Sequence, residues 1–248
     1  AQAWQQSVSG LLKLDQVEPT PLPAGLHAEL RPYQAEGFNW LAFLWRYRLG
    51  GVLADDMGLG KTLQALALML HAKETAADDV GPFLVVAPTS VVPNWVTEAR
   101  RFAPGLRVTS ITDTQARTRR PLSETVAEAD VVITSYTIFR LNAEDYQEQK
   151  WAGLILDEAQ FVKNRTTKAH QAARHLQTPF KLAITGTPME NNLMELWSIF
   201  AITAPGLFPS ALKFADTYQR PIERSGSTEL LARLRRRIRP LMTRRTKE

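Results

Sequence analysis

The segment from Gly51 to Leu70, GVLADDMGLGKTLQALALML, constrains this chain more than any other. It begins with a short apolar run typical of a buried strand and passes through a glycine-rich turn. It then continues with apolar residues at helical spacing. A strand, a loop and a helix in this order form a cradle for phosphate, because the loop N–H groups and the helix N-terminus face the anion. The segment therefore predicts a phosphate-binding loop at the end of a buried strand.

Two glycines and a Lys-Thr pair give this loop its expected chemistry. Gly58 and Gly60 let the backbone approach an anion that a Cβ atom would block. Lys61 would reach the β- and γ-phosphates, and the hydroxyl of Thr62 would ligate Mg²⁺. The pattern G-x-x-x-x-G-K-[ST] fails at one position, where Asp55 replaces the first glycine. The alternative is a glycine-rich strand-to-helix turn followed by a chance Lys-Thr pair. The predicted nucleotide-binding residues of the loop are Gly58, Leu59, Gly60, Lys61 and Thr62.

An acidic pair follows a second apolar run, in WAGLILDEAQ from Trp151 to Gln160. A nucleoside triphosphatase needs an acidic residue to hold magnesium and a base to orient the attacking water. Asp157 would bind the metal, through water, and Glu158 would polarise the nucleophilic water. Carboxylates also cap strand ends, but an adjacent Asp-Glu pair downstream of a phosphate loop favours the catalytic interpretation. The predicted catalytic residues are thus Lys61, Asp157 and Glu158.

A third apolar run ends in the turn Thr185-Gly186-Thr187-Pro188. Its hydroxyls are candidates to sense whether the γ-phosphate is present. Taken alone this is a weak signal, because such residues are common in ordinary turns.

Six ordered motifs resemble those of one family. They are LRPYQ, DDMGLGKT, LVVAPTSVVPNW, ITSY, DEAQ and ITGTPMENNLMELWSIF. Their order is that of Swi/Snf-type ATPases, the DNA-translocating and chromatin-remodelling branch of helicase superfamily two. The resemblance covers about residues 28–248, and IRPLMTRRTKE at 238–248 resembles the segment that closes the first motor lobe of that family.

The resemblance implies a RecA-like first motor lobe that binds ATP and Mg²⁺. It implies that Gln34 reads adenine and that Gln160, with the turn at 185–187, couples the nucleotide to the rest of the motor. Gln160 stands where His is commoner in the family, which puts in question how this position communicates with Thr185. The coupling residues expected on this ground are Gln160, Thr185, Gly186 and Thr187.

Polar residues after three strands are candidate DNA contacts. Short hydroxyl side chains and free N–H groups at strand ends suit phosphate contacts along nucleic acid, but Ser and Thr also cap helices. Trp95 and Trp197 have apolar surroundings, which favour the core over base stacking. The candidate DNA contacts are Thr89, Ser90, Thr134, Ser135, Lys163 and Asn164.

Strand and helix patterns alternate along the chain, which predicts an α/β fold. We expect a RecA-like, mostly parallel sheet with helices on both faces and a C-terminal helical extension. We expect an N-terminal helix and Pro-rich linker at 1–25, a RecA-like lobe at 26–190 and the extension at 191–248, with breaks at Pro205, Pro209, Pro221 and Pro240. Strands are predicted at 51–54, 83–87, 107–111, 130–134, 152–156 and 181–185, and helices at 1–18, 32–48, 61–72, 91–102, 115–128 and 166–176.

The positive charge lies in the last part of the chain. Residues 213–248 hold eleven Lys or Arg and four Asp or Glu, whereas the other 212 residues have a net charge of −2. Five arginines fall between Arg233 and Arg239. This stretch predicts an amphipathic helix whose basic face is a DNA contact, a solvated surface or an interface with the next domain.

Composition excludes several classes. The chain has no cysteine and only four histidines, which argues against disulfides and a zinc site. No apolar run reaches the length of about 18 residues that a membrane span needs, so we expect no membrane partner. An intracellular protein is expected, with a bacterial cytoplasm favoured over a nucleus because 191–239 lacks long insertions. The first residue is Ala rather than Met, which suggests a fragment of a longer protein.

These features predict the first motor lobe of a double-stranded-DNA-dependent ATPase and translocase. The resemblance implies that a second RecA-like lobe of the same polypeptide supplies arginines, so we expect very slow hydrolysis by this chain alone. A DNA-bound protein complex is a further expected partner. One alternative is an RNA- or single-strand-dependent helicase of the same superfamily. Another is a non-catalytic nucleotide-dependent switch or scaffold.

Overall fold

A seven-stranded sheet organises the computed structural model, which describes residues 19–56, 60–76, 80–186 and 192–244. The strand order is β3-β4-β2-β5-β6-β1-β7, and all of its strand pairings are parallel. The predicted α/β fold is confirmed. The strands are β1 (Gly51–Leu53), β2 (Phe83–Ala87), β3 (Val108–Ile111), β4 (Val131–Ser135), β5 (Gly153–Leu156), β6 (Lys181–Ile184) and β7 (Met242–Thr243).

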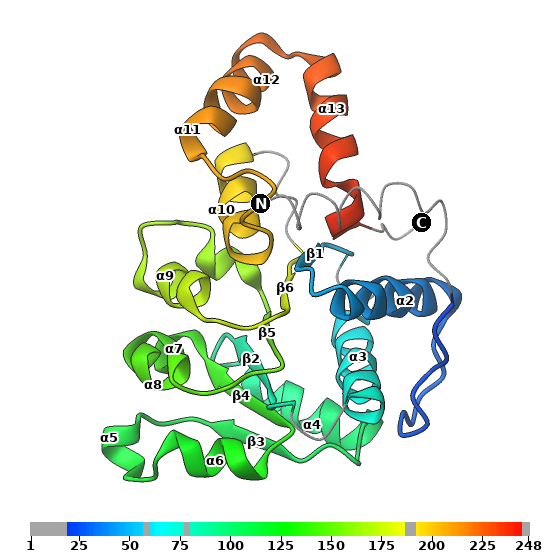
Figure 1. Cartoon of the computed structure of the whole chain (residues 1–248), viewed down its shortest axis with the longest axis vertical. Coiled ribbons are helices and arrows are strands. Elements are labelled where there is room, and N and C mark those ends of the chain that lie inside the picture. The colour runs from blue at the N-terminus through cyan, green and yellow to red at the C-terminus, as the bar shows by residue number, and fades with distance from the viewer. Residues whose placement is uncertain (1–18, 57–59, 77–79, 187–191, 245–248) are drawn as a thin grey trace.

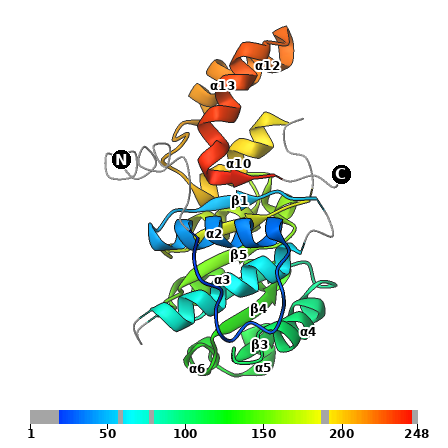
Figure 2. The ribbon, with the colours of Figure 1, turned by 90° about the vertical axis from the view of Figure 1, so that its right-hand side faces the viewer.

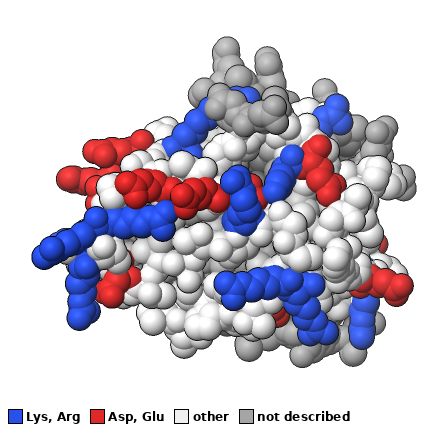
Figure 3. All heavy atoms as spheres, turned by 90° about the horizontal axis from the view of Figure 1, so that it is seen from below, with Lys and Arg blue, Asp and Glu red and all other residues white. Residues whose placement is uncertain are grey.

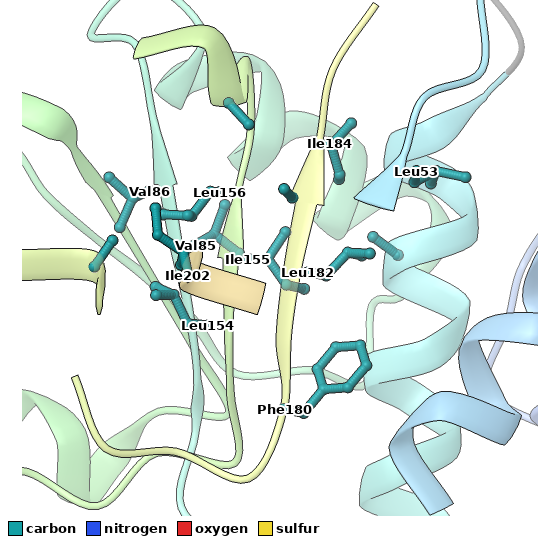
Figure 4. Close-up of a cluster of buried hydrophobic side chains, with 14 of the residues drawn as sticks. Leu53, Val85, Val86, Leu154, Ile155, Leu156, Phe180, Leu182, Ile184 and Ile202 are labelled. Atoms are coloured by element: carbon teal, nitrogen blue, oxygen red, sulfur yellow. The ribbon is translucent and has the colours of Figure 1, made fainter. Parts of the chain in front are cut away.

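The central strands consist of apolar residues because helices cover both of their faces. Val85 pairs with Ile155, which pairs with Leu182, and all three are fully buried. Figure 4 shows these side chains gathered across neighbouring strands, together with Ile202 from α10 (Leu193–Thr203). This core fixes the carboxyl ends of β1, β5 and β6 side by side.

Helices lie on both sides of the sheet, as the sequence predicts (Figure 1). The helices α2 (Pro32–Arg46), α3 (Lys61–Thr75) and α4 (Val92–Phe102) lie on one side. The other side is covered by α7 (Tyr136–Leu141), α8 (Ala143–Gln147), α9 (Lys168–His175) and α10. Two short helices, α5 (Gln115–Thr118) and α6 (Leu122–Glu128), lie near the β3 edge.

The single helix predicted at 115–128 is wrong. The chain leaves helical geometry at Arg119, whose φ is 54°, and Pro121 then precedes α6. Proline disfavours helical geometry in the residue before it, so the two short helices stay separate. The helices α7 and α8, each only five or six residues long, were not expected from the sequence.

The C-terminal part forms the predicted helical extension, which projects beyond the β1 and β7 edge of the sheet (Figure 2). The predicted break at Pro221 is wrong, because one continuous helical run extends from Ala211 to Ser225. A π-helical turn directly before Pro221 lengthens the backbone spacing where the proline lacks an N–H group. The run consists of α11 (Ala211–Phe214), the π-helix Ala215–Gln219 and α12 (Arg220–Ser225), and α13 (Thr228–Ile238) follows.

After α13 and a 3₁₀ turn at Arg239–Leu241, the chain returns to the sheet as β7, a strand that was not expected from the sequence. It lies parallel to β1, and the Ala54 N–H donates to the Thr243 carbonyl at 2.8 Å. The Trp40 indole N–H donates to the Pro240 carbonyl at 2.9 Å. The extension therefore ends beside the strand that leads into the phosphate loop.

Among the helices that the structure describes, none has both the length and the apolar character needed to span a membrane. The helix predicted at 1–18 lies outside the described residues. The proposed boundaries at 25 and 190 stay predictions.

Candidate nucleotide-binding site

The predicted phosphate loop joins β1 to α3, as the sequence pattern indicates. Gly58 and Leu59 lie outside the described residues, but the end of the loop at Gly60 is defined. Gly60 precedes α3 in the left-handed conformation, with φ of 75°. A Cβ atom there would lie 2.2 Å from Nε2 of Gln34. The left-handed backbone favours glycine at this position, and the Gln34 amide occupies the space that a side chain would need.

The Gln34 amide thus lies beside Gly60, although the two residues are 26 positions apart in the sequence. Gln34 lies in the first turn of α2 and is only 8% exposed. Its Oε1 accepts the Arg31 N–H at 2.9 Å, which directs its amide nitrogen toward Gly60. The structure thus brings the predicted adenine reader to the predicted site, while its role toward adenine stays a prediction.

Lys61 opens α3 with its ammonium group turned back over the loop. Its Nζ donates to the Asp55 carbonyl at 2.7 Å. Burial lowers the pKa of Lys61, and the surrounding carboxylates, Glu158 and Asp157 foremost, oppose that effect. An ammonium group held at a helix N-terminus near carboxylates is suited to bind the phosphates of a magnesium nucleotide.

Asp157 and Glu158 directly follow β5, within the electrostatic reach of Lys61. Burial raises the pKa of Asp157, although a hydrogen bond from the Trp95 indole N–H to Oδ2, at 2.7 Å, counteracts this effect. The Glu158 N–H donates to Asp157 Oδ1 at 2.9 Å. Glu158 itself has φ of 49°, a left-handed conformation that costs on the order of 1 kcal/mol outside glycine. The catalytic role of this pair stays a prediction.

A chain of hydrogen bonds joins the acidic pair to the turn after β6. Gln160 Nε2 donates to Glu158 Oε2 at 2.6 Å, and the Thr185 hydroxyl donates to Gln160 Oε1 at 3.3 Å. Gln160 thereby bridges Glu158 and Thr185 with both ends of its amide. The glutamine amide can therefore contact the turn in place of a histidine, while the coupling role of Gln160 stays a prediction. Gly186 follows Thr185, whereas Thr187 lies outside the described residues.

The residues at these strand ends fit Mg²⁺. Asp157 is 8% exposed, and its two carboxylate oxygens accept hydrogen bonds only from neutral N–H groups, so no hydrogen-bonded cation competes with a metal ion for them. One carboxyl oxygen of Glu98, near Thr62, is buried and has no hydrogen-bond partner. No group of three or more His, Cys, Asp or Glu among the described residues could hold a metal alone. This agrees with Mg²⁺, which usually takes one or two carboxylates and completes its shell with phosphates and water.

The candidate DNA contacts divide into exposed and buried residues. Thr89 and Ser90 are exposed in the turn after β2, so their predicted role is open to them. Lys163 and Asn164 are also exposed, although Lys163 Nζ lies 3.2 Å from a Glu195 carboxyl oxygen. Asn164 Oδ1 accepts hydrogen bonds from the N–H and hydroxyl of Thr166.

The side chains of Thr134 and Ser135 have structural partners instead. Thr134 is fully buried, and its hydroxyl donates to the Ile111 carbonyl at 3.0 Å. Ser135 is 6% exposed, and its hydroxyl caps α7 by accepting the Ile138 N–H at 3.2 Å. In this structure the capping alternative describes Ser135 better than a DNA contact does, and neither hydroxyl is directed to solvent.

Charge alone does not identify a DNA-binding face near the β3 edge. Figure 3 shows basic and acidic side chains interspersed on the face seen from below. Arg120 there lies 2.8 Å from Glu128 and 3.6 Å from Glu124, and Arg117 pairs with Asp113. Local ion pairs thus balance these cations.

Two functional neighbours of Asp157 were not expected from the sequence. Trp95 is fully buried, as expected for a core residue, yet its indole N–H is directed at Asp157. The Tyr136 hydroxyl donates to the Asp157 carbonyl at 2.6 Å. Both contacts join residues far apart in the sequence, so no local pattern could have predicted them.

Residues 33–248 match the family described as the SNF2-related domain. The chain belongs to this family. A solved structure of the Sulfolobus solfataricus SWI2/SNF2 ATPase core in complex with dsDNA is 36% identical, with a TM-score of 0.83. The match covers 94% of this chain and 47% of that chain. The RecA-like sheet of an SNF2 ATPase core is therefore confirmed.

Relatives come from bacteria and eukaryotes. YwqA of Bacillus subtilis, named as a putative ATP-dependent helicase/translocase, is 44% identical over 222 residues, which are 88% of this chain and 24% of that protein. The human TATA-binding protein-associated factor 172 is 35% identical over 260 residues, which are 96% of this chain and 14% of that protein. This SNF2-family chain thus spans a quarter or less of the length of these relatives.

Proposed function

We propose that this SNF2-family chain is the first motor lobe of a double-stranded-DNA-dependent ATPase and translocase. One observation carries the proposal: hydrogen bonds join Asp157, Glu158, Gln160 and Thr185 at the carboxyl edge of the sheet, within the electrostatic reach of Lys61. In open α/β sheets, ligands bind at this edge. A group connected in this way links the phosphates of ATP to the turn after β6.

Each residue of the group has a distinct proposed role. Lys61 leaves the Asp55 carbonyl and binds the β- and γ-phosphates of ATP. Thr62 and Asp157 hold Mg²⁺, which neutralises charge on the phosphates when it is bound. Glu158 orients the attacking water, and Gln160 holds the Glu158 carboxylate in place. Gln34, Gly58, Leu59 and Gly60 complete the ATP site.

We further propose that hydrolysis by these 248 residues alone is very slow. An arginine finger is worth about 10³- to 10⁵-fold in rate. The similar Sulfolobus ATPase core is about twice as long as the part matched here. A second RecA-like lobe of the same polypeptide is the proposed source of the arginines.

Double-stranded DNA is the proposed partner, supported by the similar Sulfolobus ATPase core, which was solved in complex with dsDNA. We propose Thr89, Ser90, Lys163 and Asn164 as its contacts because all four are exposed near strand ends. The name of the human relative, TATA-binding protein-associated factor 172, supports a DNA-bound protein complex as a further partner. The identity to the Bacillus relative supports a bacterial cytoplasm as the location.

The test is steady-state ATP hydrolysis by the natural protein extended beyond Glu248, measured with duplex DNA, single-stranded DNA, RNA or no nucleic acid. We expect duplex DNA to stimulate hydrolysis most strongly, and the 248-residue chain to be slow under all conditions. Stimulation by RNA or single strands alone would contradict the substrate. Nucleotide binding without hydrolysis in the extended protein would support a non-catalytic switch instead.

A further inference from the structure

Helix α4 presents two polar side chains to the nucleotide site from one face. Trp95 and Glu98 are three residues apart, so they lie on neighbouring turns of the same face. Trp95 donates a hydrogen bond to Asp157, and Glu98 lies near the side chain of Thr62. These two partners are the residues proposed to hold Mg²⁺. Asp157 and Thr62 therefore each have a polar neighbour on the same helix, α4.

The Trp95 contact fixes Asp157 without neutralising it. An indole N–H is a donor only, and it carries no charge. Oδ2 of Asp157 accepts this N–H at 2.7 Å, while Oδ1 accepts the backbone N–H of Glu158 at 2.9 Å. Each carboxylate oxygen is thus held by one donor and keeps further acceptor capacity. A lysine or arginine at position 95 would orient the carboxylate equally well but would repel a cation.

Glu98 supplies an acceptor for the hydroxyl of Thr62. When a threonine hydroxyl ligates a metal through its oxygen, its proton needs an acceptor on the other side. The Thr62 side chain lies close enough to the Glu98 carboxyl to lower the pKa of that group, as does the side chain of Asn94. Oε2 of Glu98 is buried and has no hydrogen-bond partner among the described residues. An unpartnered carboxylate oxygen is costly to keep buried, and it leaves Glu98 with acceptor capacity for a further donor.

We propose that Trp95 and Glu98 are positioning residues of the Mg²⁺ site. Trp95 holds the Asp157 carboxylate in place. Glu98 accepts a hydrogen bond from the Thr62 hydroxyl, so that the oxygen of Thr62 is directed to the metal. The inference rests on the proposed function, because it assumes that a magnesium nucleotide binds here.

The first experiment tests Trp95 with a matched control. Trp95→Phe removes the indole N–H and keeps an aromatic ring in the core. Trp151→Phe is the control, because Trp151 is 2% exposed and also donates a 2.7 Å hydrogen bond, to the Tyr146 carbonyl. Binding of fluorescent ADP to the 248-residue chain is measured in EDTA and across a Mg²⁺ titration.

We expect Trp95→Phe to bind ADP normally in EDTA and to need about 10- to 100-fold more Mg²⁺ for its tight binding, as for other residues that support a metal ligand. Trp151→Phe should match the wild type in both. An equal loss of affinity in EDTA and in Mg²⁺, or equal behaviour of the two variants, would overturn the inference. If the wild-type chain itself binds no ADP, the proposed function fails instead.

The second experiment separates a hydrogen-bond acceptor from a charge, and it does not disturb the core. Glu98→Ala removes the acceptor, whereas Glu98→Gln keeps an accepting oxygen and loses the charge. We expect Glu98→Ala to need about tenfold more Mg²⁺ for tight ADP binding. Glu98→Gln should need nearly as little Mg²⁺ as the wild type. Glu74→Gln is the control, because Glu74 accepts the N–H groups of Ala24 and Gly25 on another part of the surface. Wild-type behaviour of Glu98→Ala, or identical losses for Ala and Gln, would overturn the positioning role of Glu98.

Discussion

Two aspartates at opposite ends of the sheet have opposite electrostatic environments. Asp130 precedes β4 at the amino end, where it accepts the Arg107 N–H at 2.8 Å and lies 2.7 Å from Lys73 Nζ. Burial alone would raise its pKa, but the hydrogen bonds from Arg107 and Lys73 outweigh burial, and the pKa is lowered. Asp157 directly follows the carboxyl end of β5, and burial raises its pKa.

The opposite pKa shifts of Asp130 and Asp157 follow from the groups that donate hydrogen bonds to each carboxylate. Cations surround Asp130 and satisfy its charge, so this carboxylate stabilises the fold and has little left for a ligand. Neutral N–H groups of Trp95 and Glu158 hold Asp157, so its charge stays available at a cost in stability. A change at the carboxyl end should therefore alter activity, and a change at the amino end should alter stability.

The largest expected effect is that of Glu158→Gln in the natural protein that includes the proposed second lobe. Loss of the carboxylate that orients water should lower the DNA-stimulated ATPase rate by about 10²- to 10⁴-fold. ATP affinity and the melting temperature should change little, because glutamine keeps the shape of the side chain. Steady-state hydrolysis and ATP titration check this.

Glu148→Gln is the matched control, since Glu148 is exposed directly after α8. Its ATPase rate should equal that of the wild type. A Glu158→Gln variant that still hydrolyses ATP at the wild-type rate would remove Glu158 from the mechanism.

The second prediction concerns Asp130→Asn, which should lower the free energy of unfolding at pH 7 by about 2 kcal/mol. Since the folded-state pKa of Asp130 lies below its ordinary value of 3.8, its stabilisation is fully present above that value. It is lost as the pH falls through the folded-state pKa. The difference between variant and wild type should therefore be constant near neutral pH and shrink below about pH 4.

Urea unfolding at several pH values measures this difference, and Asp113→Asn is the control. Asp113 pairs with Arg117 at 3.5 Å, and its side chain is 47% exposed, so its loss should cost less than about 0.5 kcal/mol. Equal losses for the two variants would contradict the special role of Asp130. So would loss of ADP binding in a folded Asp130→Asn protein.

The sequence predicts most of this arrangement, and two of the exceptions share a physical cause. Apolar runs followed by Gly-Lys-Thr or Asp-Glu predict strand ends and their chemistry, since residue type and position act together there. The β7 pairing and the contact of Trp95 with Asp157 join residues distant in sequence, and no local pattern encodes such contacts. Ser135 shows the converse, because a hydroxyl at a strand end fits a cap and a phosphate contact equally well until its partner is known.

The third prediction tests the hydrogen-bond chain at the carboxyl end. Gln160→Ala should lower the DNA-stimulated rate about tenfold, the effect of losing one hydrogen bond to a charged group. Thr185→Val should have a similar effect, and the double variant should be no worse than either single one. Gln160→His should keep most of the rate. Additive losses in the double-mutant cycle would show that Gln160 and Thr185 act separately.

The smallest expected effect lies in the extension. The charge of Arg237, like that of Asp130, is engaged by contacts within the protein. Its guanidinium donates to the Tyr218 hydroxyl and the Leu207 carbonyl and lies 4.8 Å from the centre of the Phe208 ring. Arg237→Ala should lower the free energy of unfolding by about 1 kcal/mol. Arg233→Ala should stay within about 0.5 kcal/mol, because the arginine is exposed and forms no hydrogen bond or ion pair within the described part of the chain.

Thermal unfolding of the two variants measures this contrast, and their duplex-DNA affinity against salt concentration extends it. If the basic face of α13 contacts DNA, Arg233→Ala should reduce the salt slope by about one unit without any loss of stability. Arg237→Ala should leave the slope nearly unchanged, because its guanidinium is already engaged within the protein. A reversed result, with stability depending on Arg233 and the salt slope on Arg237, would show that internal contacts do not separate structural from ligand-binding charges in this chain.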